Sequence, residues 1–184
     1  MKKNIEVRYN VLSDSLFKLI KEKLESEDFP WYFLKNSAYP DNKELVKQRY
    51  LNYSFYHLVL NDKNITSNYF DVTNAISLVL KDSFKLKTSY DLFRLRWGMT
   101  TSLNMTYKNT PHTDMLTPHK VILFYLSKSD GKTYFYDKEH NIIDSILPKE
   151  NSAILFDGLI RHSSSKPVEF ARRIVLNINL KETV

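Results

Sequence analysis

The chain has 184 residues, of which 42% are hydrophobic, so it is long enough for one domain with a buried core. It has no cysteine, which excludes disulfides, thiolate metal sites and a cysteine nucleophile. The formal net charge of +6 is spread along the chain, and we interpret it as a solubilising charge; an acidic or nucleic-acid partner is the alternative. No segment approaches the ~18 consecutive apolar residues of a membrane span. We therefore expect a soluble cytoplasmic protein without membrane contact.

The first half of the chain shows helical periodicity. A helix is predicted over residues 13–25, where a Ser-Asp cap precedes apolar residues at helical spacing, and another over residues 68–84. A shorter helix is expected over residues 40–50. The aromatic run at residues 29–33 is interpreted as a core anchor rather than a binding platform. The apolar stripes of the two longer helices are Leu16, Leu19, Ile20 and Leu24, and Val72, Ala75, Ile76, Val79 and Leu80.

From about Tyr90 the pattern changes to short strands separated by turn compositions. Because the chain has only three glycines, its turns must rely on Asn, Asp, Ser and Pro. The predicted strands cover residues 91–97, 102–107, 120–126, 132–136, 142–147, 152–156 and 173–180.

Many short strands after a helical N-terminal third predict a mainly β domain with some α structure. We expect a double-stranded β-helix, or jelly roll, backed by the N-terminal helices. The alternative is an α+β sandwich without a cavity. One domain is expected, with residues 1–89 as the helical support region and residues 90–184 as the jelly-roll core.

Two histidines and one aspartate form the candidate catalytic and metal-binding site. His112 and Asp114 stand at positions i and i+2, so both side chains would project from one face of a strand, and His162 must come from another strand. Two imidazoles and one carboxylate can occupy one face of an octahedral metal and leave the opposite face open. A His-x-Asp triplet alone is weak evidence, and the competing interpretation of His112 is a surface-loop histidine beside Pro111.

The order of the surrounding motifs strengthens the metal-site interpretation. They are Pro111-His112-Thr113-Asp114, Leu123-Phe124-Tyr125-Leu126, Gly131-Lys132-Thr133-Tyr134-Phe135, Ala153-Ile154-Leu155-Phe156 before His162, and Arg173-Ile174-Val175-Leu176-Asn177. Over roughly residues 90–180 this order resembles the Fe(II)/2-oxoglutarate-dependent dioxygenases, closest to the prolyl-hydroxylase-like branch. The N-terminal helices, with Pro30-Trp31-Tyr32, also resemble those of small viral and marine members, which would fit a virus-encoded protein.

The resemblance implies a double-stranded β-helix with Fe(II) held by His112, Asp114 and His162. It also implies 2-oxoglutarate as a co-substrate that chelates the metal, with ascorbate as a further reductant. The distal carboxylate of 2-oxoglutarate would pair with an arginine on the last strand.

Arg172 and Arg173 compete for that carboxylate. Strand parity places Arg173 on a face with Asn177 and Asn179, whereas Arg172 shares the apolar face of the strand. A buried guanidinium needs partners, and a polar-lined face suits a cavity that binds a dicarboxylate. We therefore expect Arg173 to be the anchor and Arg172 to lie outward or near the entrance. The alternative is that both are surface charges.

The sequence departs from the resembled family at three positions. Asn151 and Lys132 stand where glycines are common, and Val175 stands where many members carry a hydroxyl residue. These differences affect the co-substrate contacts rather than the metal ligands. By position, secondary co-substrate contacts are expected from Tyr107 or from Tyr125.

The other histidines are given structural interpretations. His119 is an alternative third ligand, disfavoured because it begins the strand that follows Asp114. His57 is expected to be packed or half-exposed, and His140 to be solvated in a turn.

These features predict an Fe(II)- and 2-oxoglutarate-dependent dioxygenase that hydroxylates an unidentified substrate. By analogy with the resembled branch, we expect a peptidyl prolyl or other protein side chain first, and a small molecule second. Nucleic acid is not favoured, because Arg173 is not followed by the second arginine of an Arg-x-Asn-x-x-x-Arg pattern. The alternatives are a cupin-like binding module without redox activity and a basic nucleic-acid-binding domain, which would need its lysines on one face.

Overall fold

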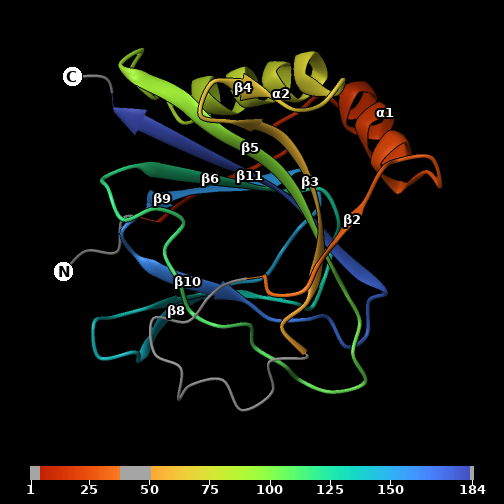
Figure 1. The fold of residues 1–184 in the computed structure, drawn as a ribbon, viewed down its shortest axis with the longest axis vertical. Helices are drawn as coiled ribbons and strands as arrows, with labels where there is room; N and C mark the ends of the chain where they lie inside the picture. The colour runs from red at the N-terminus through yellow and green to blue at the C-terminus, as the bar shows by residue number, and fades with distance from the viewer. Residues whose placement is uncertain (1–4, 38–50, 183–184) are drawn as a thin grey trace.

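The computed structural model describes residues 5–37 and 51–182, which form two facing antiparallel β-sheets with two helices outside the larger sheet (Figure 1). The larger sheet contains, in spatial order, β1 (Glu6–Tyr9), β9 (Ser152–Asp157), β6 (Lys120–Tyr125), β11 (Arg172–Glu182), β5 (Tyr90–Thr101), β3 (Ser54–Asn61) and β2 (Tyr32–Leu34), with β4 (Asn64–Ile65) paired to β3. The smaller sheet contains β10 (Arg161–Ser164), β7 (Thr133–Tyr136) and β8 (Ile142–Ile146). This is the predicted double-stranded β-helix.

The helices α1 (Asp14–Glu25) and α2 (Phe70–Ser83) lie close to the ranges predicted for them. The expected helix over residues 40–50 lies outside the described residues. Both helices pack on the outer face of the larger sheet, where Phe17 meets Phe124 edge to face. Each fully buried aliphatic side chain in this layer contributes about 1.5–3 kcal/mol. Neither helix in the described residues has the length and apolar character needed to cross a bilayer.

The buried face of α2 differs from the predicted stripe. Val72 and Val79 are 39% and 41% exposed, while Thr73 and Ser77 are buried beside Ile76. Thr73 tolerates burial because its hydroxyl accepts a hydrogen bond from the Trp97 indole at 3.1 Å. Apolar periodicity therefore predicted the helix correctly but predicted the wrong residues for its buried face. Periodicity cannot anticipate that a polar residue such as Thr73 finds a hydrogen-bond partner on the sheet.

Six of the predicted strands are present, and the strand predicted over residues 102–107 is wrong. This segment bonds instead to the connection before β11, with the Ser102 and Leu103 amides donating to the carbonyls of Ala171 and Pro167. The sequence analysis also missed five strands: β1, β2, β3, β4 and β10. Four of these come from residues 1–89, so that region adds strands to the larger sheet as well as helices. The division into support region and core stays a prediction.

The space between the two sheets holds a second, inner core. Alternation along β6 turns Val121, Leu123 and Tyr125 toward it, where they meet Phe135 of the smaller sheet and Val175 of β11. The opposite side chains of β6 and β11 join the outer core under the helices. The central strands are therefore buried on both faces, and the site must be built into the inner one.

Left-handed backbone conformations fall on residues other than glycine, as the glycine-poor composition requires. Among the described residues, positive φ occurs at Asn10, Asp62, Lys63, Lys85, His140 and Asn151. Asn151 has φ 52° where the resembled family commonly has glycine. Its side chain also accepts from the Leu12 amide at 2.9 Å and donates to the Leu12 carbonyl at 2.8 Å, which ties the segment before α1 to the start of β9.

Two substitutions should separate the backbone role of Asn151 from its hydrogen bonds. Asn151→Gly keeps the left-handed conformation but removes both bonds, and we expect it to lower the free energy of unfolding by about 1–3 kcal/mol. Asn151→Ala should lower it by about 1 kcal/mol more, because alanine is strained at positive φ. Urea unfolding measures both values. Alanine matching or exceeding glycine in stability would contradict the backbone argument.

Candidate metal centre

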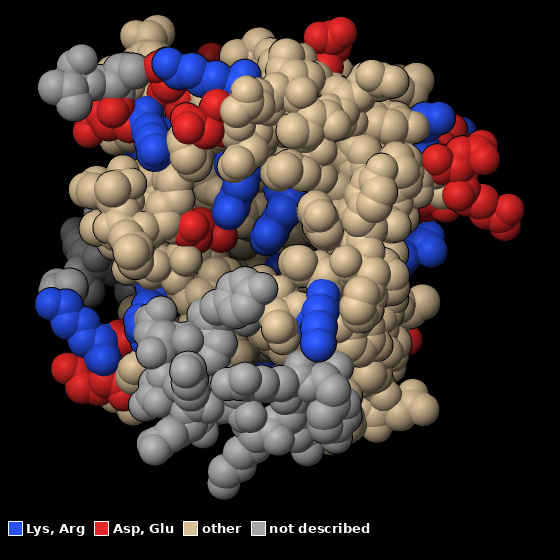
Figure 2. Space-filling model, in the orientation of Figure 1, with Lys and Arg blue, Asp and Glu red and all other residues tan. Residues whose placement is uncertain are grey.

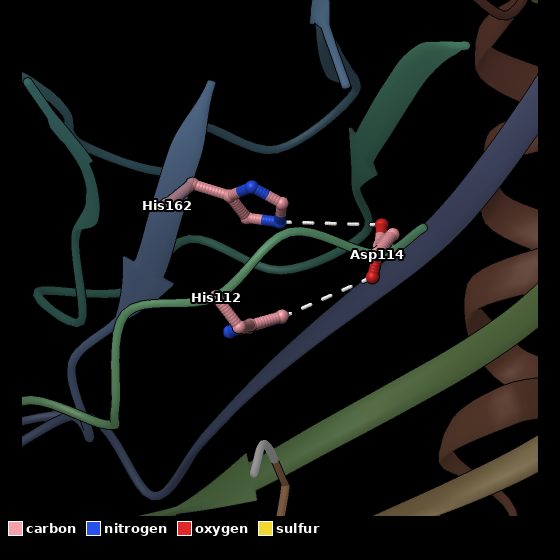
Figure 3. Close-up of side chains that lie close together, drawn as sticks. All are labelled: His112, Asp114 and His162. Atoms are coloured by element: carbon pink, nitrogen blue, oxygen red, sulfur yellow. Dashed lines mark ion pairs between the residues drawn. The ribbon is translucent and has the colours of Figure 1, made fainter. Parts of the chain in front are cut away.

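His112, Asp114 and His162 converge in the structure (Figure 3). His112 and His162 form an isolated antiparallel bridge in which each backbone amide donates to the other residue's carbonyl, at 3.0 and 2.9 Å. Their ring centroids are 4.8 Å apart. The Asp114 carboxylate faces both rings, with Oδ1 3.9 Å from His112 Nε2 and Oδ2 4.0 Å from His162 Nε2. One potential ligand atom from each residue lies within 4.8 Å of the others.

The local structure around His112 differs from the expectation. His112 and Asp114 do not share a strand; they lie in a connection that bonds to β10 through the bridge at His112 and through the Asn109 amide, which donates to the Ser164 carbonyl at 2.8 Å. These backbone hydrogen bonds align the connection with the strand that carries His162.

Each imidazole is oriented by a backbone carbonyl. His112 Nδ1 lies 3.0 Å from the Thr110 carbonyl, and His162 Nδ1 lies 3.1 Å from the Ile160 carbonyl. Because a carbonyl can only accept, Nδ1 carries the proton and donates in both residues. Nε2 therefore keeps its lone pair on the side of the ring that faces Asp114, as a metal ligand requires.

The ionisation states suit a divalent cation. Burial lowers the pKa of His162 to about 4, with the neighbouring His112 acting in the same direction, and burial also lowers the pKa of His112. Burial alone would raise the pKa of Asp114, but the positive charge of Arg94 and the two histidines bring it well below its usual value. At neutral pH the site thus contains two neutral imidazoles and one carboxylate.

Three side chains from two neighbouring strands hold the Asp114 carboxylate, which is 3% exposed. Arg94 of β5 forms an ion pair with Oδ1 at 2.7 Å. Asn177 and Asn179 of β11 each donate to Oδ2 at 2.9 Å. Sequence reasoning placed the two asparagines on the polar face but missed Arg94 and its neighbour Arg96. The parity argument used for Arg173 would have found them, since both alternate with apolar residues in a predicted strand.

The two candidate anchor arginines point in opposite directions. Arg173 is 4% exposed and faces inward, where its Nη2 donates to Thr133 Oγ1 at 2.8 Å and its guanidinium carbon lies 5.5 Å from the Tyr125 ring centroid. Arg172 faces outward, and its Nη2 forms an ion pair with Glu25 of α1 at 3.2 Å. This placement follows the strand parity.

The two tyrosines expected near the co-substrate are placed differently. Tyr125 is fully buried, and its hydroxyl lies 2.8 Å from the Thr133 hydroxyl, so it supports the residue that contacts Arg173. Tyr107 is not among the residues that line the cavity; its backbone carbonyl accepts from the Lys166 amide at 2.9 Å.

The remaining histidines stay outside the cluster. His119 is buried against Gly158, and its Nδ1 lies 2.8 Å from the Thr117 carbonyl. His57 is packed, with its two ring nitrogens bonded to the Pro30 carbonyl and the Ser67 hydroxyl. His140 is exposed in a turn at positive φ, as expected.

A cavity of about 80 Å³ adjoins the cluster. His112, His162 and Arg173 line it together with Arg96 and Thr133. Figure 2 shows Lys and Arg side chains gathered beside a hollow near the middle of the face it presents. Two of the three candidate ligands, His112 and His162, therefore share one cavity with two inward guanidiniums.

Comparison with known proteins gives a clear result for the fold. No protein-family model matches the chain, and no curated protein sequence matches it significantly. Among solved structures, an oxidoreductase of the 2OG-Fe(II) oxygenase family from Burkholderia pseudomallei has a TM-score of 0.67 at 10% identity, covering 96% of this chain and 85% of its own.

Two further structures contain a bound peptide or a bound small molecule. A prolyl hydroxylase from Trichoplax adhaerens, in complex with a hypoxia inducible factor peptide, has a TM-score of 0.65 at 12% identity, covering 98% of this chain and 84% of its own. HygX from Streptomyces hygroscopicus, with nickel, 2-oxoglutarate and hygromycin B bound, has a TM-score of 0.63 at 10% identity with the same coverage. Identities this low establish a shared fold, so the chain has the double-stranded β-helix fold of the 2-oxoglutarate/Fe(II) oxygenases.

Proposed function

We propose that the chain is an Fe(II)- and 2-oxoglutarate-dependent dioxygenase that hydroxylates its substrate. One observation carries the proposal: His112, Asp114 and His162 converge beside a cavity that also contains the buried guanidinium of Arg173. The shared fold supports it. A cupin-like binding module without redox activity would not require an oriented ligand triad and a separate anion anchor in one cavity.

The donor set fits Fe(II). Two neutral imidazoles and one carboxylate are the ligands of the facial triad, and the adjoining cavity leaves space for further ligands. His112, Asp114 and His162 would hold the ion, and bound iron would supply the dioxygen chemistry that couples oxidation of 2-oxoglutarate to hydroxylation of the substrate. The chain's own residues supply orientation: backbone carbonyls fix the two rings, and Arg94 and the two β11 asparagines fix the carboxylate.

Arg173 is the proposed anchor for the distal carboxylate of 2-oxoglutarate. A buried guanidinium is costly unless an anion pairs with it, and Arg173 forms no ion pair within the described residues. Its Nε also lacks a hydrogen-bond partner there. Thr133, held in turn by Tyr125, orients one edge of the guanidinium and leaves it able to meet a carboxylate.

For the substrate we propose a peptidyl prolyl or other protein side chain, with a small molecule as the second candidate. Structures of the same fold were determined with a peptide and with hygromycin B, so the fold accommodates both. The cytoplasm is the proposed compartment.

Loss of any proposed metal ligand should abolish turnover. We expect His112→Ala, Asp114→Ala and His162→Ala each to reduce Fe(II)-stimulated succinate formation from 2-oxoglutarate by more than about 100-fold, because the chelating set is broken. His140→Asn, at an exposed turn where asparagine tolerates the positive φ, is the matched control and should retain activity. If all three variants kept substrate-free 2-oxoglutarate decarboxylation, the ligand assignment would be wrong.

The two β11 arginines should differ in co-substrate binding. Arg173→Gln should weaken 2-oxoglutarate binding to the Mn(II)-loaded protein by roughly tenfold or more, because it removes a charge-assisted, partly desolvated contact. Arg172→Gln should leave the affinity unchanged, since that side chain contacts Glu25 on the outer face. Calorimetric titration measures both, and the reverse order would reject Arg173 as the anchor.

The buried neutral His162 should make the metal-free protein acid-sensitive. The unfolded chain has a histidine of ordinary pKa near 6.5, while burial lowers the folded value to about 4. The unfolded state therefore binds more protons in this window, and the free energy of unfolding should fall as pH drops from about 6.5 to 4, by up to roughly 3 kcal/mol. His162→Gln should show a shallower decline in urea unfolding. Equal slopes for the two proteins would argue against a neutral buried His162.

A further inference from the structure

Arg96 is a second inward-facing cation that the proposed mechanism does not use. It lies on β5 two residues beyond Arg94 and lines the same cavity as His112, His162 and Arg173. No hydrogen bond or ion pair within the described residues involves its guanidinium. Burial lowers the pKa of Arg96 and the charge of Arg94 acts in the same direction, while Asp114 and Tyr56 oppose the shift without reversing it.

The cavity contains more positive charge than its own residues balance. Among the described residues that line it, the only permanently charged ones are Arg96 and Arg173. Within residues 5–37 and 51–182, the carboxylate beside the cavity is that of Asp114, which is already paired with Arg94. A bound divalent ion would add two positive charges. The two carboxylates of 2-oxoglutarate would add two negative charges, one beside the metal and one beside Arg173. Arg96 would still lack a counter-ion, although unpaired charges are costly to bury.

The geometry separates Arg96 from Arg173. In the register of β5 with β11, Arg96 lies opposite Asn177, whereas Arg173 lies opposite Thr100, four residues further along β5. That offset corresponds to about 13 Å along the strands. Between them, Gly98 lies opposite Val175, and its missing side chain leaves the inner face open. The arrangement favours two separate anions over one anion shared by both guanidiniums.

We propose that Arg96 forms a second anion subsite, which binds a carboxylate, phosphate or sulfate group of the substrate to be hydroxylated. The inference rests on the proposed function and narrows its substrate class to compounds or side chains with an acidic group near the oxidised carbon. A planar guanidinium suits this role because it can bind such groups through two parallel hydrogen bonds. The other source of the same chemistry is the 1-carboxylate of 2-oxoglutarate, and binding measurements separate the two.

The test uses inorganic sulfate as the probe. The protein is loaded with Mn(II), which avoids turnover, and saturated with 2-oxoglutarate before sulfate is titrated calorimetrically at low ionic strength. Wild type should bind one sulfate per chain. Arg96→Gln should weaken sulfate binding by roughly tenfold or more, while changing 2-oxoglutarate affinity by less than about threefold.

Two controls define the specificity of the effect. Arg172→Gln removes an outward arginine and should leave sulfate binding unchanged. Arg96→Lys keeps the charge but not the planar fork and should retain part of the affinity, which guards against a folding defect in Arg96→Gln.

Three outcomes would overturn the inference. Wild type could bind no sulfate in the presence of 2-oxoglutarate. Arg96→Gln could weaken 2-oxoglutarate as strongly as Arg173→Gln, which would assign Arg96 to the co-substrate. Absence of metal-dependent 2-oxoglutarate binding by wild type would reject the proposed function and this inference with it, whereas the first two outcomes leave the proposed function intact.

Discussion

Asp114 lies outside the strands, so the position of its carboxylate depends on the side chains that bind it. Arg94 of β5 contacts one oxygen, and Asn177 and Asn179 of β11 contact the other. They reach it together because Arg94 lies opposite Asn179 in an antiparallel pair. If either strand shifted by one residue relative to the other, its side chains that hold Asp114 would point to the outer face of the sheet. The position of Asp114 therefore depends on the register of β5 with β11. The His112–His162 bridge then brings the two histidines together beside it.

The same strand pair gives the cavity its electrostatic character. Alternate residues of β5 and β11 bring three guanidiniums to the inner face, against one carboxylate in the described part of the chain, while both imidazoles stay neutral because they are buried. In a partly desolvated cavity such an excess attracts anions more strongly than it would in water. The proposed selectivity for acidic ligands would thus arise from the same alternation that builds the sheet, and metal binding would increase it.

Sequence reasoning succeeded where the signal is local and periodic. Two helices, six strands and the inward orientation of Arg173 follow from spacings that the chain itself displays. It failed where the structure of a segment depends on contacts with another segment far away in the sequence. Residues 102–107 form no strand because their amides bond to the connection before β11, and β10 is too short and polar to be recognised without its neighbour β7. The roles of Arg94 and Arg96 were missed because alternation places them on one face of β5 without showing that this face lines a cavity beside Asp114.

By itself, the sequence determined the ligand types, the absence of thiolate chemistry and the face of each β11 residue, because composition and two-residue alternation do not depend on distant contacts. Only the tertiary structure decided that His112 meets His162 through one backbone bridge and that Arg94 neutralises Asp114. It also placed Arg96 in the cavity with no ion pair to any residue that the structure describes. These features require strands far apart in the chain to pair in one register, and pairing of that kind is set by the packing of the whole domain.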